Sequence, residues 1–328
     1  MGIITKLGAA ALAVTFATGA QAQELKLADF QPPTHFIVDT TYGPFADAIS
    51  AATDGEVTVD VFMGGELGAG PLEQYNRVVD GVADIAFGLP GYTASNFPLT
   101  LISELPGVIT AEGGTKAMMD NVDMLSDEYR RVQLVGLWNN APNLLLMAEK
   151  TVSSMDDLSG LNIRVPSRNA GLVVQAWGAN PVSMPAPEIY NAMQTGVIDG
   201  AMIDPTTLKA FKLAEVTTSI TQGMDTTISE FFLIMNRDVF NGLDDTARQA
   251  VLEAGRDAAM TAGSTWLRIA DQSMADFEAT DGKEVITLSD EEAARFNEAS
   301  GAAVAQIVAD AEAEGIPAQA WIDALKAD

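Results

Sequence analysis

The chain of 328 residues has no cysteine and a single histidine, His35. Without cysteine, disulfides, thiolate zinc sites and cysteine nucleophiles are excluded. A Ser–His–Asp triad would have only His35 as its base, and no Gly-x-Ser-x-Gly elbow accompanies it. The fold must therefore rest on a hydrophobic core, which about 300 residues can form, usually as two domains. We expect neither a metal nor a cofactor.

Positive charge is also scarce. Lysine and arginine total 18 against 45 acidic residues, which gives a net charge of −27 at pH 7. Nucleic acids and anionic lipid surfaces both attract clustered basic residues, so we expect neither as a partner. An anionic small molecule is not excluded, because one arginine fork can act against the overall field. The acidity itself fits a well-solvated surface.

No apolar run is long enough to cross a bilayer. Residues 1–22 have the layout of a secretory signal: Lys6, an apolar stretch over 7–17, and the small-x-small sequence Ala20-Gln21-Ala22. We predict export to the periplasm and cleavage before Gln23. Since no cysteine can accept a lipid, we expect a soluble protein without direct membrane insertion.

Strand and helix patterns alternate along the rest of the chain. The first five predicted elements are strand 24–28, helix 42–53, strand 57–62, helix 71–80 and strand 83–89. Such alternation favours an α/β fold with mostly parallel strands. Further strands are predicted at 131–138, 143–147 and 226–236, and a long helix at 244–277. Several of these later segments look like crossings between two lobes.

Two short segments of similar sequence support two lobes of similar construction. Residues 80–87 read DGVADIAF, and residues 195–202 read TGVIDGAM. Each stretch follows an apolar helix, ends it at a glycine that tolerates positive φ, and starts a strand. Coincidence is the alternative, but the shared context favours a repeat. We predict residues 23–142 plus 230–272 as the first lobe, and 143–229 plus 273–328 as the second.

Arg164 stands in a predicted strand that begins near Leu161 and stops at Pro166. Its planar fork of five N–H donors can hold a carboxylate through two parallel hydrogen bonds. In a chain so poor in cations, this arginine marks a candidate anion site. The alternative, which spacing alone favours, is a structural pair with one of the many nearby acids.

The chain resembles the solute-binding proteins of TRAP (tripartite ATP-independent periplasmic) transporters, the DctP-like family. Four segments carry the resemblance: GGELG at 64–68, the FP…LP segment at 97–106, LSGLNIRVP at 158–166, and PEIYNAMQTGVIDG at 187–200. The third has Asn162 where the family pattern has lysine. The order and spacing of the four segments hold over the whole mature chain.

The resemblance implies a two-lobed periplasmic-binding-protein fold, type II-like, with crossover strands and a long helix bridging both lobes. It implies a receptor, not an enzyme, that closes on a small organic acid and delivers it to the TRAP permease subunits in the membrane. The arginine of the family's Arg-x-Pro strand holds the ligand carboxylate, and that role falls on Arg164. We expect a monomer.

One departure from the family bears on the ligand. Many members that bind sugar acids carry an asparagine just after the Val-Asp-Gly turn, where this chain has Ile203 followed by Asp204. An apolar side chain there cannot hydrogen-bond ligand hydroxyls, which favours a smaller aliphatic or aromatic carboxylate. Arg168 could supply a second cation, or it could be an exposed arginine beside local acids.

Other candidates follow strand ends, where α/β sheets bind ligands. Tyr92 could contact the ligand or pack a loop, and His35 could contact it or cap a loop. Trp138 could form an apolar wall or be plain core, and Asn140 could donate to a carboxylate or hydroxyl. Phe231 and Phe232 face opposite sides of one strand, so one should line the cleft and the other belong to the core.

Two functions from other classes compete with a receptor for transport. A secreted hydrolase or isomerase could use a carboxylate pair such as Glu66 with Glu230. These two acids could equally balance Arg164, accept from a ligand hydroxyl, or face water. The second competitor is a ligand-sensing subunit of a signalling receptor, which would share the fold and the site.

Overall fold

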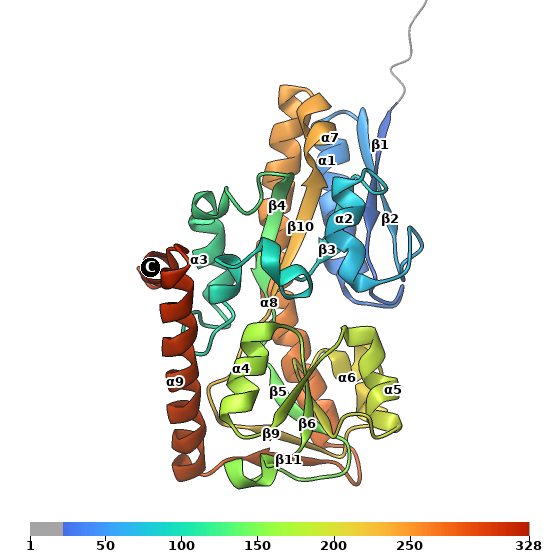
Figure 1. Cartoon of the computed structure of the whole chain (residues 1–328). Helices are drawn as coiled ribbons and strands as arrows, with labels where there is room; N and C mark the ends of the chain where they lie inside the picture. Colours follow the sequence, from blue (N-terminus) through green and yellow to red (C-terminus); the bar gives the residue numbers. More distant parts are fainter. Residues whose placement is uncertain (1–21, 328) are drawn as a thin grey trace, which may run out of the picture.

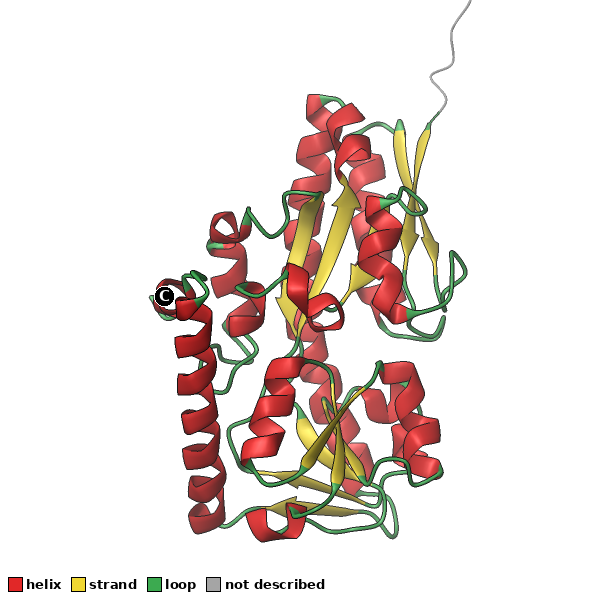
Figure 2. Cartoon of the chain, viewed as in Figure 1, coloured by secondary structure: helices red, strands yellow, loops and turns green. Residues whose placement is uncertain are grey.

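The computed structural model describes residues 22–327, so the predicted signal peptide lies outside this range except for its last residue. Two mixed sheets, each with helices packed on it, form two lobes (Figures 1 and 2). The first sheet has the spatial order β2 (Val57–Phe62), β1 (Gln23–Ala28), β3 (Ile85–Gly88), β10 (Glu230–Asn236) and β4 (Val132–Asn139). The second runs β11 (Glu284–Thr287), β9 (Ser219–Gln222), β5 (Leu144–Met147), β8 (Gly200–Ile203), β6 (Asn162–Val165) and β7 (Asn180–Ser183).

Both sheets combine parallel strands with one antiparallel crossover strand. In the first sheet β10 pairs antiparallel with β3 and β4, and in the second β5 pairs antiparallel with β8 and β9. The other pairings of the described strands are parallel. The predicted α/β fold with crossover strands is thereby confirmed, and the antiparallel pairs are those made by the crossovers.

The two similar segments, residues 80–87 and 195–202, occupy equivalent places in the two lobes. Gly81, after α2 (Gln74–Val79), and Gly196, after α5 (Ile189–Gln194), have φ of 72° and 70°. In this left-handed region a side chain would be strained, so glycine ends each helix and lets a strand start at once. The strands that follow, β3 and β8, each have one parallel and one antiparallel neighbour.

Two connections cross between the lobes side by side. They are residues 140–143, between β4 and β5, and residues 223–229, between β9 and β10. The Asn140 amide donates to the Ser229 carbonyl at 2.9 Å, and the Asn143 amide to that of Thr227 at 2.9 Å. We refer to these two hydrogen-bonded connections, residues 140–143 and 223–229, as the hinge.

The helix α8 (Asp245–Glu278) bridges both lobes (Figure 1). It starts at Asp244, whose carboxylate accepts from the Ala247 amide at 2.8 Å. Its first half packs on β4 and α1 (Gly43–Ala52), and its far end reaches β11 and α6 (Thr207–Ala210). The predicted long helix is therefore an element shared by the two lobes.

The remaining helices cover the sheets and link the lobes. They are α3 (Gly114–Asp120), α4 (Arg168–Ala176), α7 (Arg237–Gly242), α9 (Asp290–Ala313) and α10 (Ala318–Leu325). The start of α9 packs on the second lobe, where the Trp177 indole donates to Ser300 at 2.8 Å. Trp321 and Leu325 instead belong to the core of the first lobe. Residues 307–325 thus return to the first lobe, whereas the predicted boundary left them in the second.

Candidate functional site

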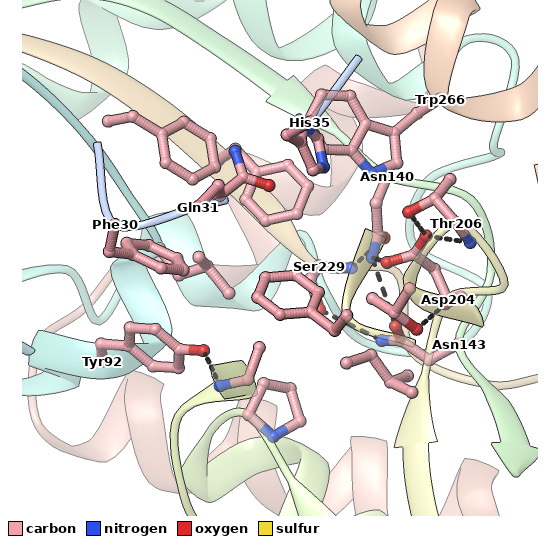
Figure 3. A pocket seen from close by; sticks show the side chains of 18 of the residues that line it. Phe30, Gln31, His35, Tyr92, Asn140, Asn143, Asp204, Thr206, Ser229 and Trp266 are labelled. Atoms are coloured by element: carbon pink, nitrogen blue, oxygen red, sulfur yellow. Dashed lines mark hydrogen bonds between the residues drawn. The ribbon is translucent and has the colours of Figure 1, made fainter. Parts of the chain in front are cut away.

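A cavity lies between the lobes, beside the hinge (Figure 3). About 440 Å³ of space, part of it open to solvent, lies between its lining atoms. Loops after β1, β3, β4, β6 and β8 contribute to it, together with Trp266 of α8. Seven of the predicted site residues line this cavity: His35, Tyr92, Asn140, Arg164, Ile203, Asp204 and Phe231.

Arg164 is 1% exposed and projects from β6 into this cavity. Its Nε donates to the Met184 carbonyl at 2.9 Å, one terminal nitrogen donates to the Met202 carbonyl at 3.4 Å, and the other to the Tyr92 hydroxyl at 3.4 Å. These bonds use three of its five N–H groups and hold the fork in place. Two N–H groups are left, which is the number that a bidentate carboxylate accepts.

Arg164 forms no direct ion pair within the part of the chain that the structure covers. The carbonyl and hydroxyl partners are neutral, and none of the described acids forms a salt bridge with it. Burial lowers the pKa of its guanidinium, and the interaction with the Tyr92 hydroxyl and the charge of Asp204, which lies beyond salt-bridge distance, oppose this effect. Arginine nevertheless keeps its proton in proteins, so the cavity holds a buried cation.

Tyr92 connects the two lobes at the same place. It lies in the first lobe, and its hydroxyl accepts from the Ala186 amide of the second lobe at 2.8 Å, as well as from Arg164. Burial raises the pKa of this phenol, so the hydroxyl keeps its proton. Because both bonds use the oxygen as acceptor, the O–H is available to donate to a ligand beside Arg164.

The walls of the cavity are mostly aromatic. Phe231 has its ring centroid 5.2 Å from that of Phe87 and 4.9 Å from that of Trp266. Phe30 lies 5.6 Å from Phe87 and 6.1 Å from Tyr92. These rings surround the cavity with flat apolar surface. Phe232, by contrast, is in the core and packs against Phe97, as the alternation along the strand predicts.

The polar groups on the hinge side of the cavity mainly bind one another (Figure 3). The Asn140 side-chain amide donates to Asn143 at 3.2 Å and to Asp204 at 3.1 Å, and its oxygen accepts from the Ser229 amide at 2.7 Å. Asp204 also accepts from the Thr206 amide at 3.0 Å. Burial raises the pKa of Asp204, and these hydrogen bonds oppose the rise. Asn140 therefore has no free amide hydrogen for a ligand in this arrangement.

Three predicted site residues do not line the cavity. Trp138 is fully buried behind the wall, with its ring 5.8 Å from Phe87 and 6.2 Å from Trp266. Arg168 is exposed at the start of α4 and borders a separate groove beside α9. Glu66 is exposed on the loop after β2. In each case the residue lies near a cleft-forming loop, but its side chain faces another way.

Two further buried carboxylates lie at the contact between the lobes. Glu104 of the first lobe accepts a hydrogen bond from the Ser167 hydroxyl of the second at 2.7 Å. Burial raises the pKa of Glu104 to about 8. Burial, and then the nearby charge of Glu104, raise the pKa of Glu230 well above its ordinary range. One Glu230 oxygen has no hydrogen-bond partner.

Several lining residues were not predicted from the sequence. The main ones are Phe30, Gln31, Phe87, Asn143, Thr206, Phe211, Ser229 and Trp266. Trp266 lies in the middle of a long alanine-rich helix, where nothing nearby in the sequence marks a ligand site. Phe30 and Gln31 do have a signal, since they directly follow the end of β1 as Tyr92 follows that of β3.

Comparison with known proteins places this geometry in context. The family model for bacterial extracellular solute-binding proteins, family 7, matches residues 27–311. A solute-binding protein of Albidiferax ferrireducens is 27% identical over 206 residues, which cover 61% of this chain and 60% of that protein. The alignment thus spans somewhat under two thirds of this relative's length.

Solved structures match over nearly the whole chain. A TRAP solute-binding protein from a marine metagenome, described as specific for aromatic acid ligands, superposes with a TM-score of 0.87 at 26% identity, covering 93% of this chain and 98% of that one. That structure contains metahydroxyphenylacetate. A TRAP periplasmic solute-binding protein of Bordetella bronchiseptica with bound mandelate has a TM-score of 0.84 at 28% identity, covering 93% and 98%. Both neighbours are receptors rather than enzymes.

Proposed function

The chain belongs to the bacterial extracellular solute-binding proteins, family 7, the receptors of TRAP transporters, and we propose that it captures a small monocarboxylate with a flat apolar body. An aromatic acid is the ligand class that the cavity fits best. The protein binds its ligand without converting it, as a receptor. Uptake would then depend on a membrane permease that receives the ligand.

The observation that carries this proposal is the unpaired cation in the cleft. Arg164 is buried, fixed by neutral partners and left with two N–H donors. A buried charge without a partner costs several kcal/mol, roughly, unless an ion of opposite sign enters. The Tyr92 hydroxyl adds a third donor at the same place. A ligand carboxylate would satisfy all three.

The rest of the cavity supports an apolar ligand body. Phe30, Phe87, Phe231 and Trp266 offer ring faces, and Ile203 lines the cavity. By the family resemblance, many members that bind sugar acids carry an asparagine at the Ile203 position. The hinge-side amides are occupied by one another, so they offer little to a chain of ligand hydroxyls. The neighbours with bound hydroxyphenylacetate and mandelate agree with this ligand class.

Capture would proceed by closure of the lobes about the paired crossings. Tyr92, bonded to Ala186 and Arg164, connects the first lobe to the residues that would hold the carboxylate. The ligand would thus stabilise the closed arrangement through contacts that the open one lacks. We propose that the TRAP permease recognises the closed lobes and takes up the ligand.

We also propose that the chain acts in the periplasm as a monomer, after removal of residues 1–22. No helix within residues 22–327 is both long and apolar enough to cross a membrane. A mature amino terminus at Gln23, found by intact-mass measurement on periplasmic protein, would support this. Retention of residues 1–22 on the exported protein would contradict it.

The structure bears differently on the two competing functions, an enzyme and a sensing subunit. The proposed acid–base pair of Glu66 with Glu230 is not assembled, because Glu66 is exposed on a loop and Glu230 is 2% exposed inside the lobe contact. A sensing role in a signalling receptor would use the same cavity. The neighbouring genes would distinguish it, by encoding either a permease or a receptor kinase.

A thermal-shift screen against a library of organic acids tests the proposal, since a ligand that binds only the native state raises its melting temperature. We expect aromatic or short aliphatic monocarboxylates to give the largest shifts and hexuronates little or none. Calorimetry should then show one site, and NMR should show the ligand unchanged after incubation. Tight hexuronate binding would refute the ligand class, and ligand turnover would refute the receptor.

A further inference from the structure

Gln31 presents a fixed hydrogen-bond acceptor to the cavity. Its side-chain nitrogen donates to Asp29 at 3.1 Å, and the Asp29 carboxylate also accepts from the Gln31 backbone at 2.8 Å and from the Tyr42 hydroxyl at 2.6 Å. A carboxylate only accepts, so the amide nitrogen must face Asp29 and the amide oxygen must face away. Figure 3 shows that oxygen turned toward the side of the cavity where His35 lies.

His35 presents a fixed donor to the same cavity. Its Nδ1 accepts from the Ile37 backbone amide at 3.2 Å, so the proton of the neutral ring is on Nε2. Burial lowers the pKa of His35 to about 3, which keeps the ring neutral. The ring is held against Phe36 and Trp266, with centroids 4.2 and 5.5 Å away. None of the described residues accepts from Nε2.

The first-lobe side of the cavity thus offers one acceptor and one donor, both neutral. Asp29, Tyr42 and the Ile37 amide serve only to orient them. A ligand ammonium could not accept from His35, and a second carboxylate could not donate to Gln31. A hydroxyl is the smallest ligand group that does both at once.

We propose that Gln31 and His35 together bind a hydroxyl group on the ligand body, so that the receptor selects hydroxylated aromatic acids over their unsubstituted counterparts. The ligand O–H donates to the Gln31 amide oxygen, and the oxygen of that ligand hydroxyl accepts from His35 Nε2–H. This inference rests on the proposed function, in which Arg164 binds the carboxylate. It adds a specificity contact on the opposite lobe.

Calorimetric titration with matched ligand pairs tests this subsite. The probes are 3- and 4-hydroxyphenylacetate, each compared with the methyl analogue of similar size. We expect the better hydroxylated acid to bind about tenfold or more tightly than its methyl counterpart, since the methyl group leaves two buried polar groups unpaired. Equal affinities of the wild-type protein for the hydroxylated acids and their methyl analogues would overturn the hydroxyl subsite. That result would not affect the proposal that the protein binds carboxylates.

Two variants assign the preference to the residues. Gln31→Met and His35→Phe should each reduce the hydroxyl preference to about twofold or less, because each replaces a polar group that the methyl analogue leaves unpaired with an apolar one. Gln74→Met is the matched control, because Gln74 is a buried glutamine of the same lobe that bonds the Ala28 carbonyl outside the cavity. A preference that survives in both variants would overturn the assignment.

Further outcomes separate the subsite from the proposed function. If no aromatic or aliphatic acid binds the wild-type protein, both inferences fail. If a carboxamide in place of the hydroxyl gives tighter binding, the hydroxyl assignment is overturned. The ligand comparison on the wild-type protein needs no variant, so it is decisive even where a substitution prevents folding.

Discussion

Arg164 and the pair Glu104–Glu230 are both buried at the contact between the lobes, yet burial affects them differently. The glutamates can take up protons, and burial raises the pKa of each. Arg164 cannot lose its proton under ordinary conditions and forms no salt bridge with any of the described acids. The glutamates can therefore become neutral within the protein, whereas the arginine needs an anion from outside.

This contrast separates a structural charge from a functional one. Glu104 keeps a hydrogen bond to Ser167 and needs no further group. Arg164 is oriented by backbone carbonyls and by Tyr92, and its remaining donors face a cavity. A site is thus marked by the group whose burial the protein alone does not compensate.

Removing the cation should have the largest effect. Arg164→Met is expected to weaken binding of the best aromatic acid by about 30-fold to several-thousand-fold, because truncation of a buried charge pair costs about 2–5 kcal/mol. Arg164→Lys should also bind poorly, since a point charge does not reproduce the fork. The apo melting temperature should stay unchanged or rise. Calorimetry and thermal unfolding measure the two quantities.

Arg237→Met is the control for this change. Arg237 is a structural arginine of the first lobe, which donates to Gln133 at 2.7 Å and to the Tyr129 carbonyl at 3.0 Å, away from the cavity. We expect it to lower the melting temperature and leave ligand affinity intact. If Arg164→Met gave this same result, Arg164 would be structural as well.

The buried glutamates should make stability depend on pH. A carboxyl group with an ordinary pKa of 4.5 unfolded and about 8 folded binds more protons in the native state between these values. Its stabilising contribution is therefore complete below about pH 4.5 and is lost as the pH rises toward 8. Glu104→Gln should remove part of this loss, since its amide oxygen can still accept from Ser167.

Melting temperatures of this variant between pH 5 and 8 provide the check. We expect the variant to match the wild-type protein near pH 5 and to exceed it by a few degrees near pH 8, roughly as 1–2 kcal/mol would give. Glu112→Gln, at an exposed position, should leave the profile unaltered. Equal pH profiles for Glu104→Gln and the wild-type protein would contradict the account.

Removing the hydroxyl of Tyr92 should have a smaller effect on binding. Tyr92→Phe leaves the Ala186 amide without its partner and takes one donor from the carboxylate site. We expect affinity to fall about tenfold, near 1.4 kcal/mol, mainly through faster dissociation. Tyr190→Phe is the control, because Tyr190 bonds Glu215 on the surface of the second lobe. Stopped-flow kinetics measures the dissociation rate of the ligand. An unchanged dissociation rate in Tyr92→Phe would contradict the prediction.

Glu66 and Arg168 should have the smallest effects. Both are exposed and lie outside the cavity, Glu66 on the loop after β2 and Arg168 at the start of α4. Glu66→Gln and Arg168→Ala should change ligand affinity by about twofold or less, as expected of surface charges. A larger loss in either variant, measured by calorimetry, would show that the closed cavity does not account for the whole site.

Much of the fold could be predicted from the sequence because it depends on local patterns. The glycine at the end of α2 and α5, the alternation in β2, and the period of α8 each act within a few residues. The return of residues 307–325 to the first lobe was not predictable in this way. It depends on where the apolar face of α10 finds a partner, which is set by the packing of Trp321 against a distant part of the chain.

Site residues divide along the same line. Tyr92, Arg164 and Ile203 lie at strand ends, which sequence patterns can locate. Trp138 also lies near the end of its strand, as expected. Its ring, however, lies behind Phe231 and not in the cavity, which the strand pattern alone does not reveal. Trp266 has no local signal, since only the crossing of α8 behind the hinge brings it to the ligand cavity.

The claim that Arg164 binds the ligand carboxylate is tested most directly by removing the charge from the ligand and from the protein in the same experiment. The best-binding acid and its carboxamide would be titrated into the wild-type protein and into Arg164→Met under identical conditions. The account predicts that the wild-type protein prefers the acid by about 100-fold or more, and that the variant binds acid and amide with nearly equal affinity. A variant that keeps the full preference for the acid would show that another group binds the carboxylate.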